Sequence, residues 1–126
     1  TERTAALMRQ MLVEVTRTGG TGTRAAIKGY NVAGKTGTAE KIKDGHYVSN
    51  ENVSSFMGIL PAERPEIGII VVLDSPVDPV NKLRTGGITA GPVFAQIAEP
   101  VARYLDIRPV DAAEMVYYHR ILENAP

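Results

Sequence analysis

Apolar residues recur every three or four positions near the start of the chain, a spacing typical of a helix with one buried face. The stripe runs through residues 4 to 16. Thr4 stands where a hydroxyl can cap the first turn, and Gly19-Gly20 stands where a helix can end. The stripe consists of Leu7, Met8, Met11, Leu12 and Val15.

A second stripe predicts a helix over residues 91 to 105. Pro92 falls near its first turn, where the missing N–H costs least. Pro100 falls inside it and predicts a kink, because the Gln96 carbonyl loses its partner. A shorter amphipathic stretch begins near Asp111 and predicts a helical tail. Its apolar positions are Met115, Tyr118, Ile121 and Leu122.

The middle of the chain alternates with a period of two, which predicts strands. Residues 30 to 42 form the first, and a polar turn is expected from 43 to 52. A half-buried strand follows at 53 to 60. After a proline-bounded turn, residues 67 to 74 form the most apolar strand, which we expect to be buried on both faces. Short connections of this kind join antiparallel strands into a three-strand meander.

The order of helix, three strands and helix predicts an α+β fold with helices packed on an antiparallel sheet. With 126 residues, of which 44% are hydrophobic and 22% charged, the chain is expected to build one packed core. Basic and acidic residues are equal at 14 each, so there is no cationic excess to recruit nucleic acid. There is no cysteine for disulfide or thiol chemistry. The longest apolar run, residues 67 to 73, is too short for a membrane helix.

Candidate chemistry gathers in Lys35-Thr36-Gly37-Thr38, where a cation and two hydroxyls lie on a strand-like stretch suited to an anion. Two interpretations compete. Lys-Thr-Gly is a signature of serine penicilloyl-transferring enzymes. The eight residues from Gly29 to Thr36 also fit G-x-x-x-x-G-K-T, the phosphate-binding loop of nucleotide-binding proteins.

The surroundings disfavour the phosphate loop. Such a loop follows an apolar strand and opens a helix. Residues 21 to 28 contain no apolar run of four, and residues 37 to 52 show no helical period. The anion-binding strand is therefore the favoured interpretation.

His46 and His119 are isolated in the sequence, so we expect neither a metal site nor a cofactor.

Several motifs in order now identify a resemblance. The chain resembles the C-terminal part of a class B penicillin-binding protein transpeptidase domain, whose fold is similar to that of serine β-lactamases. The resemblance covers residues 1 to 109, and the pattern ends before a tail at 110 to 126. It rests on Gly19-Gly20-Thr21-Gly22, Tyr30 through Ala39, Ser55-Phe56-Met57-Gly58, Pro61, Gly86-Gly87 and Ala90-Gly91-Pro92-Val93-Phe94.

The resemblance implies roles for particular residues. Lys35 would add positive potential near the carboxylate of a D-alanyl-D-alanine stem peptide or a β-lactam. Thr36 and Thr38 would donate hydroxyl hydrogen bonds, and the Thr38 N–H would be one of two oxyanion-hole donors. Gly37 would let substrate approach the backbone. Gly86-Gly87 would begin the segment that borders the cleft; Thr85 stands where many relatives carry an aromatic residue.

Two motifs of that family are missing. The nucleophile of that family lies in a Ser-x-x-Lys motif, and a second triad is Ser-x-Asn. In this chain no serine is followed three residues later by lysine or two residues later by asparagine. Acyl transfer needs an activated nucleophile, so we expect the chain alone to be inactive and to be a fragment. Its partner would be the missing N-terminal portion. The serines are Ser49, Ser54, Ser55 and Ser75.

The favoured function is therefore part of a peptidoglycan D,D-transpeptidase. A noncatalytic penicillin-binding-like interaction domain is the alternative, and a β-lactamase is a weaker one. The resemblance implies an extracytoplasmic enzyme whose parent protein is anchored in the membrane. Separated from its missing helices, the sheet would expose apolar faces and strand edges, which predicts aggregation, pairing with a partner chain or a domain-swapped oligomer.

Overall fold

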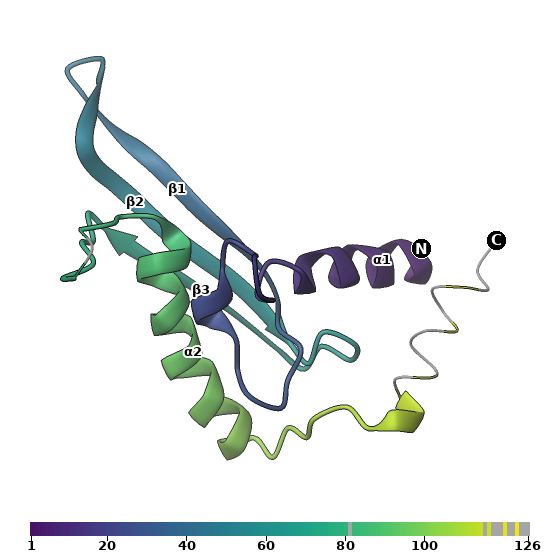
Figure 1. Ribbon diagram of the computed structural model, residues 1–126. Coiled ribbons are helices and arrows are strands. Elements are labelled where there is room, and N and C mark those ends of the chain that lie inside the picture. The colour runs from purple at the N-terminus through teal and green to yellow at the C-terminus, as the bar shows by residue number, and fades with distance from the viewer. Residues whose placement is uncertain (81, 115, 117–119, 121–122, 124–126) are drawn as a thin grey trace.

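The structure is a computed structural model that describes residues 1–80, 82–114, 116, 120 and 123. One long helix covers a three-stranded sheet and a shorter helix lies at the end of the sheet (Figure 1). The apolar positions predicted for the tail helix, from Met115 to Leu122, lie outside the described residues. The elements are α1 (Glu2–Val13), the 3-10 turn η1 (Thr23–Ala25), β1 (Ala33–Lys43), β2 (His46–Leu60), β3 (Ile67–Asp74) and α2 (Gly86–Tyr104).

The three strands form an antiparallel sheet in the order β1-β2-β3, so the predicted meander and the α+β class are confirmed. Thr36, Phe56 and Val71 lie opposite one another across the sheet. Directly opposite side chains share a face, and neighbours along a strand alternate. Phe56 and Val71 are buried in the core, which places this register line on the α2 face of the sheet.

The first hairpin differs from the prediction. Instead of a polar turn over residues 43 to 52, the chain reverses at Asp44-Gly45, and β2 begins at His46. Both turn residues have positive φ, 51° and 79°. This is the backbone of a two-residue hairpin loop, for which Asp-Gly is a favoured pair. The ladder therefore continues past the predicted boundary, with one register shift between Glu40 and Ile42.

The prediction that residues 67 to 74 are buried on both faces is wrong. Val71 is buried, whereas Ile70 and Val72 beside it are 66% and 61% exposed. The reason is that β3 is an edge strand and α2 covers one face only. A continuous apolar run does not distinguish one covered face from two.

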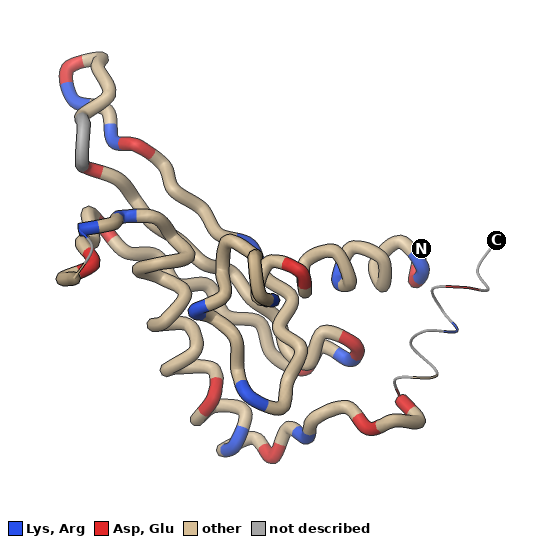
Figure 2. The backbone as a smooth tube through the Cα atoms, viewed as in Figure 1, with Lys and Arg blue, Asp and Glu red and all other residues tan. Residues whose placement is uncertain are grey.

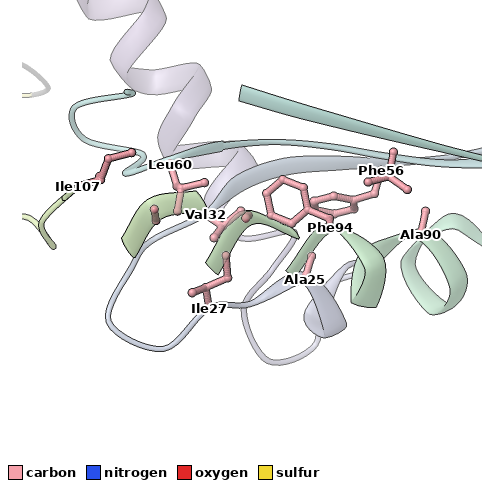
Figure 3. Packing of buried hydrophobic residues seen from close by; sticks show 11 residues of the cluster. Ala25, Ile27, Val32, Phe56, Leu60, Ala90, Phe94 and Ile107 are labelled. Carbon is pink, nitrogen blue, oxygen red and sulfur yellow. The ribbon is translucent and has the colours of Figure 1, made fainter. Parts of the chain in front are cut away.

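The core lies between α2 and the sheet (Figure 3). Phe56 of β2 and Phe94 of α2 are both fully buried, with ring centroids 4.9 Å apart and ring planes at 57°. Tilted aromatic pairs of this kind contribute about 0.5–1.5 kcal/mol beyond the area they bury. The remaining buried members are Ala25, Ile27, Val32, Leu60, Val71, Ala90, Ala98, Ala102 and Ile107.

Three glycines leave room for the two aromatic rings. A Cβ atom on Gly34 would lie 2.5 Å from Phe56, and one on Gly22 would lie 2.8 Å from the same ring. A Cβ atom on Gly58 would lie 2.5 Å from Phe94. These distances are far below van der Waals contact, so the ring pair fits only because the three positions carry no side chain.

The first helix is displaced from its prediction. It begins two residues earlier, capped by Thr1, whose hydroxyl accepts the Thr4 N–H at 3.2 Å. Thr4 is therefore inside the helix, and α1 ends at Val13 rather than at Gly19-Gly20. Its predicted stripe is only partly used: Leu12 is half-buried, whereas Leu7, Met8 and Met11 are exposed.

The second helix is longer than predicted and begins five residues earlier, at Gly86. The Ile88 and Thr89 N–H groups both donate to the Thr85 carbonyl at 3.0 Å and set its first turn. Pro92 is thus inside the helix rather than in its first turn. The helix also continues across Pro100, and the expected kink there stays a prediction.

Candidate functional site

The Lys-Thr-Gly segment lies on β1, an edge strand, so one side of its backbone has no neighbouring strand among the described residues. Lys35 is opposite Met57 and therefore lies on the open face, away from α2. Thr36 and Thr38 lie on the α2 face by alternation. Lys35 and Thr38 are both exposed, and Thr36 and Gly37 are half-buried. The motif thus offers groups on both sides of a free strand edge.

The start of α2 is joined directly to this strand. The Gly86 N–H donates to the Thr38 hydroxyl oxygen at 3.1 Å, across 48 residues of sequence. A Cβ atom on Gly86 would lie 2.2 Å from the Ser55 carbonyl oxygen and 2.4 Å from that of Gly37. Because both contacts are to backbone, a side chain could be placed there only by moving strands. The structure therefore brings Gly86 against the Lys-Thr-Gly strand.

Gly87 meets the same strand through a second segment. A Cβ atom on it would lie 1.8 Å from the Thr21 carbonyl oxygen and 3.2 Å from the Thr36 methyl group. The hydroxyls of Thr21 and Thr36 are 3.3 Å apart. Five of the six predicted site residues therefore meet at the junction of β1 with the first turn of α2, whereas Lys35 lies on the same strand but on the opposite, open face. The five are Thr36, Gly37, Thr38, Gly86 and Gly87.

Two buried polar residues that the sequence did not single out hold this junction. Ser54 is fully buried and its hydroxyl donates to the Arg84 carbonyl. The Asn52 side-chain amide donates to the same carbonyl at 3.1 Å. Both donors are on β2, and Arg84 precedes the helix by two residues. The sequence signal for both is a polar residue at a strand position whose side chain faces the core, because positions 52 and 54 alternate in step with Phe56.

Charges around the site are mixed in sign (Figure 2). The Lys35 ammonium donates to the carbonyl of Thr36 at 2.8 Å. Farther along β1, hydrogen bonding by the Lys43 ammonium holds the pKa of the Glu51 carboxyl below its ordinary value. In the same way, Lys41 and then the Ser75 hydroxyl lower the pKa of Asp74. The cations after the motif are thus engaged by carboxylates.

Two cavities lie outside the junction itself. One of about 260 Å³ is bounded by β1, β2 and the segment before α2, and its lining includes Glu40, Asn52 and Arg84. A larger one of about 520 Å³ lies elsewhere, beside Arg64 and Arg108. Among the described residues, no group of three or more His, Asp or Glu side chains could hold a metal ion. None of the described helices is long and apolar enough to cross a bilayer.

Comparison with known proteins gives the family. The profile of the penicillin-binding protein transpeptidase domain matches residues 1–99. The chain belongs to this family. The resemblance to the C-terminal part of a class B transpeptidase domain, inferred from the motifs, is confirmed.

Named relatives and solved structures agree with the match. The chain is 39% identical over 106 residues to the Neisseria flavescens "probable peptidoglycan D,D-transpeptidase PenA", covering 84% of this chain and 26% of that protein. It is 40% identical over 100 residues to the Escherichia coli K12 peptidoglycan D,D-transpeptidase FtsI, covering 79% and 16%. The chain therefore spans about a quarter or less of these relatives.

The fold is that of solved transpeptidase domains. The apo transpeptidase domain of Burkholderia pseudomallei penicillin-binding protein 3 superposes with a TM-score of 0.70 at 36% identity, covering 82% of this chain and 30% of that one. Penicillin-binding protein 3 of Mycobacterium tuberculosis, complexed with ampicillin, gives 0.66 at 31% identity, covering 85% and 25%. This transpeptidase-family chain thus forms a contiguous part of a larger known fold.

Proposed function

We propose that this chain supplies the Lys-Thr-Gly strand of a serine D,D-transpeptidase that cross-links peptidoglycan through an acyl-enzyme. The observation that carries the proposal is the 3.1 Å hydrogen bond from the Gly86 N–H to Thr38. It joins the two separate segments that the motifs assign to one cleft. Membership of the family and relatives named as D,D-transpeptidases support it.

In this function Lys35 adds positive potential beside the terminal carboxylate of a stem peptide or a β-lactam. An exposed ammonium on the strand can do so without a large desolvation cost. The hydroxyls of Thr36 and Thr38 donate to the same anion. A peptide pairing with the free edge of β1 passes between the open face, where Lys35 lies, and the α2 face, where the threonines lie.

The backbone of the motif carries the second part of the chemistry. We assign the Thr38 N–H as one oxyanion donor, with the other supplied by the serine nucleophile. Loss of one such donor typically costs about 100- to 1,000-fold in rate. Gly37, with no Cβ atom, lets the substrate come close to the strand. Gly86 and Gly87 border the cleft and hold the strand from the α2 face.

The nucleophile must come from a segment with Ser-x-x-Lys, since no serine here has that context. We therefore propose that this chain is inactive by itself and acts with a Ser-x-x-Lys-bearing partner segment, in an extracytoplasmic protein anchored to the membrane. Residues 1–109 would be the transpeptidase part and 110–126 a tail. Analytical ultracentrifugation of residues 1–126 alone tests whether this chain depends on a partner segment. A concentration-independent monomer with a cooperative melt would contradict that dependence.

Intact-mass spectrometry after incubation with a fluorescent penicillin tests the function. In the gene product that contains residues 1–126, we expect one label on a serine outside these residues. Lys35→Gln should slow labelling strongly, whereas Lys41→Gln, a matched change on the same strand, should not. A label within residues 1–126 would overturn the assignment of the nucleophile.

The noncatalytic interaction domain is the second candidate, because both serine motifs are missing from these residues. The same experiment separates the two functions. No labelling of a protein whose other regions also lack Ser-x-x-Lys would support the interaction domain. Labelling that depends on Lys35 would exclude it.

A further inference from the structure

Arg24 connects three segments around the site, although it lies outside the Lys-Thr-Gly and Gly86-Gly87 motifs. It belongs to η1, and its Nη1 atom is 3.0 Å from the Asp78 carboxylate and 3.4 Å from the Ile88 carbonyl oxygen. Asp78 lies in the connection between β3 and α2, and Ile88 lies in the first turn of α2. One guanidinium therefore spans from η1 to both the helix and the segment that leads into it.

The contact to Ile88 replaces a hydrogen bond that the helix cannot make. In an α-helix the Ile88 carbonyl would accept from the N–H of residue 92. That residue is proline, which has no N–H. Arg24 donates to this carbonyl from the side. The Ile88 carbonyl, which has no i+4 donor, thereby accepts from a side chain of another segment.

The contact to Asp78 fixes the connection that precedes the helix. The side chain of Asp78 is only 9% exposed. Its second carboxylate oxygen accepts the Val80 N–H at 2.9 Å. Its backbone N–H donates to the Leu83 carbonyl and its carbonyl accepts from the Lys82 N–H, at 2.9 and 3.0 Å. Asp78 is thus the centre of a tight turn that ends just before Arg84.

We propose that Arg24 is a positioning residue for the transpeptidase site: through Asp78 and Ile88 it sets where Gly86 meets Thr38. This rests on the proposed function. Removing the guanidinium takes an ion-pair partner from the buried Asp78 carboxylate and a side-chain donor from the Ile88 carbonyl, which weakens the hold on the turn. Gly86 has no free space against the Gly37 backbone, so any shift of the turn is transmitted to the strand.

Acylation kinetics test the proposal in the gene product that contains residues 1–126. Arg24→Ala should lower the saturating rate of acylation by fluorescent penicillin about 10- to 100-fold, since a misplacement of about 1 Å can cost about 100-fold. The concentration for half-saturation should change little. Arg24→Lys keeps a cation and should retain most of the rate. The matched control is Arg17→Ala, because Arg17 forms an exposed ion pair with Glu14 just after α1.

A rescue experiment separates positioning from stability. Pro92→Ala restores an N–H that can donate to the Ile88 carbonyl. In the Arg24→Ala background it should recover part of the lost rate, whereas alone it should leave the rate near wild type. A wild-type rate in Arg24→Ala, or a rate that falls only in proportion to the folded fraction, would overturn the proposal.

Hydrogen exchange measured on the gene product that contains residues 1–126 tests the geometry without catalysis. The Gly86 amide, donor to Thr38, should exchange at least about 10-fold faster in Arg24→Ala, and amides of the β2–β3 ladder should not change. Unchanged Gly86 exchange would refute the positioning role. If the wild-type gene product is not acylated at all, the proposed function fails, and this experiment still decides the role of Arg24.

Discussion

The two faces of the sheet differ sharply although the same three strands build both. The face toward α2 carries Phe56 and Val71, both buried. The other face carries Met57, Ile70 and Val72, which are all exposed. Apolar side chains are present on both, so composition does not decide which face is a core. The presence of a covering element does, and here α2 covers one face only.

Truncating the ring at the centre of the covered face should have the largest effect. Phe94→Ala removes the partner of Phe56 and should lower the free energy of unfolding by about 3–5 kcal/mol. Ile97 is on the same helix and 42% exposed, so Ile97→Ala is the control and should cost much less. Urea denaturation followed by circular dichroism measures both. Equal losses would mean that α2 does not bury Phe94 in solution.

Adding a methyl group to the covered face should be nearly as costly. Gly58→Ala places a Cβ atom 2.5 Å from the Phe94 ring and should cost about 3 kcal/mol, the upper end for overpacking. A second change, Phe94→Leu, should recover part of that loss. Gly68→Ala on β3 places its Cβ atom 3.3 Å from an Ile59 methyl group, a much milder contact, and is the control. Additive losses in the double variant would argue against the predicted clash.

Adjacent valines on β3 give the most closely matched test of the two faces. Val71→Thr buries a hydroxyl and should cost about 1–2 kcal/mol. Val72→Thr makes the same change on the open face and should stay within about 0.5 kcal/mol. Thermal melts of the two variants compare them directly. A Val72→Thr loss as large as that of Val71→Thr would show that the open face is covered in solution.

The smallest effect is expected at the polar end of the open face. Lys41 lowers the pKa of Asp74, so the folded state favours the carboxylate. That stabilisation is present at neutral pH and is lost as pH falls through the lowered pKa, below about 4. Asp74→Asn should therefore flatten the acid dependence of Tm slightly. The same substitution in a Lys41→Met background should have a smaller effect, because only the Ser75 hydroxyl and the charge of Lys43 still lower the pKa of Asp74 there.

Local pattern predicted the strands well because alternation reports directly on a half-buried sheet. It missed the hairpin because residues 43 to 52 are mostly polar on both sides of Asp44-Gly45, although that pair is itself a strong signal for a two-residue loop. It also missed the first turn of α2. Glycine has low helix propensity, so Gly86-Gly87 does not suggest a helix start. Glycine stands at these two helical positions because neighbouring backbone lies too close for any side chain.

Only the contiguous part of the site could be predicted from the sequence. Lys35 through Thr38 are contiguous, so the motif is visible in sequence. Their supports are not contiguous: Ser54 reaches Arg84 over 30 residues, and Arg24 reaches Asp78 over 54. A buried serine or an aspartate in a connection has no local pattern that names its partner. Such pairs become apparent only once the strands and α2 are placed.

The close contacts between three glycines and the two aromatic rings limit how such sequences can diverge. Gly22, Gly34 and Gly58 come from different parts of the chain, yet at all three a Cβ atom would clash with the ring at position 56 or 94, and at Gly34 also with the Met57 carbonyl oxygen at 2.9 Å. A substitution at one of these glycines therefore disrupts the packing unless the clashing ring is first replaced by a smaller side chain, and at Gly34 the backbone must shift as well. Descendants of this sequence should change these five positions together, and a covariation signal should link them across the alignment of any sufficiently diverse set of its relatives.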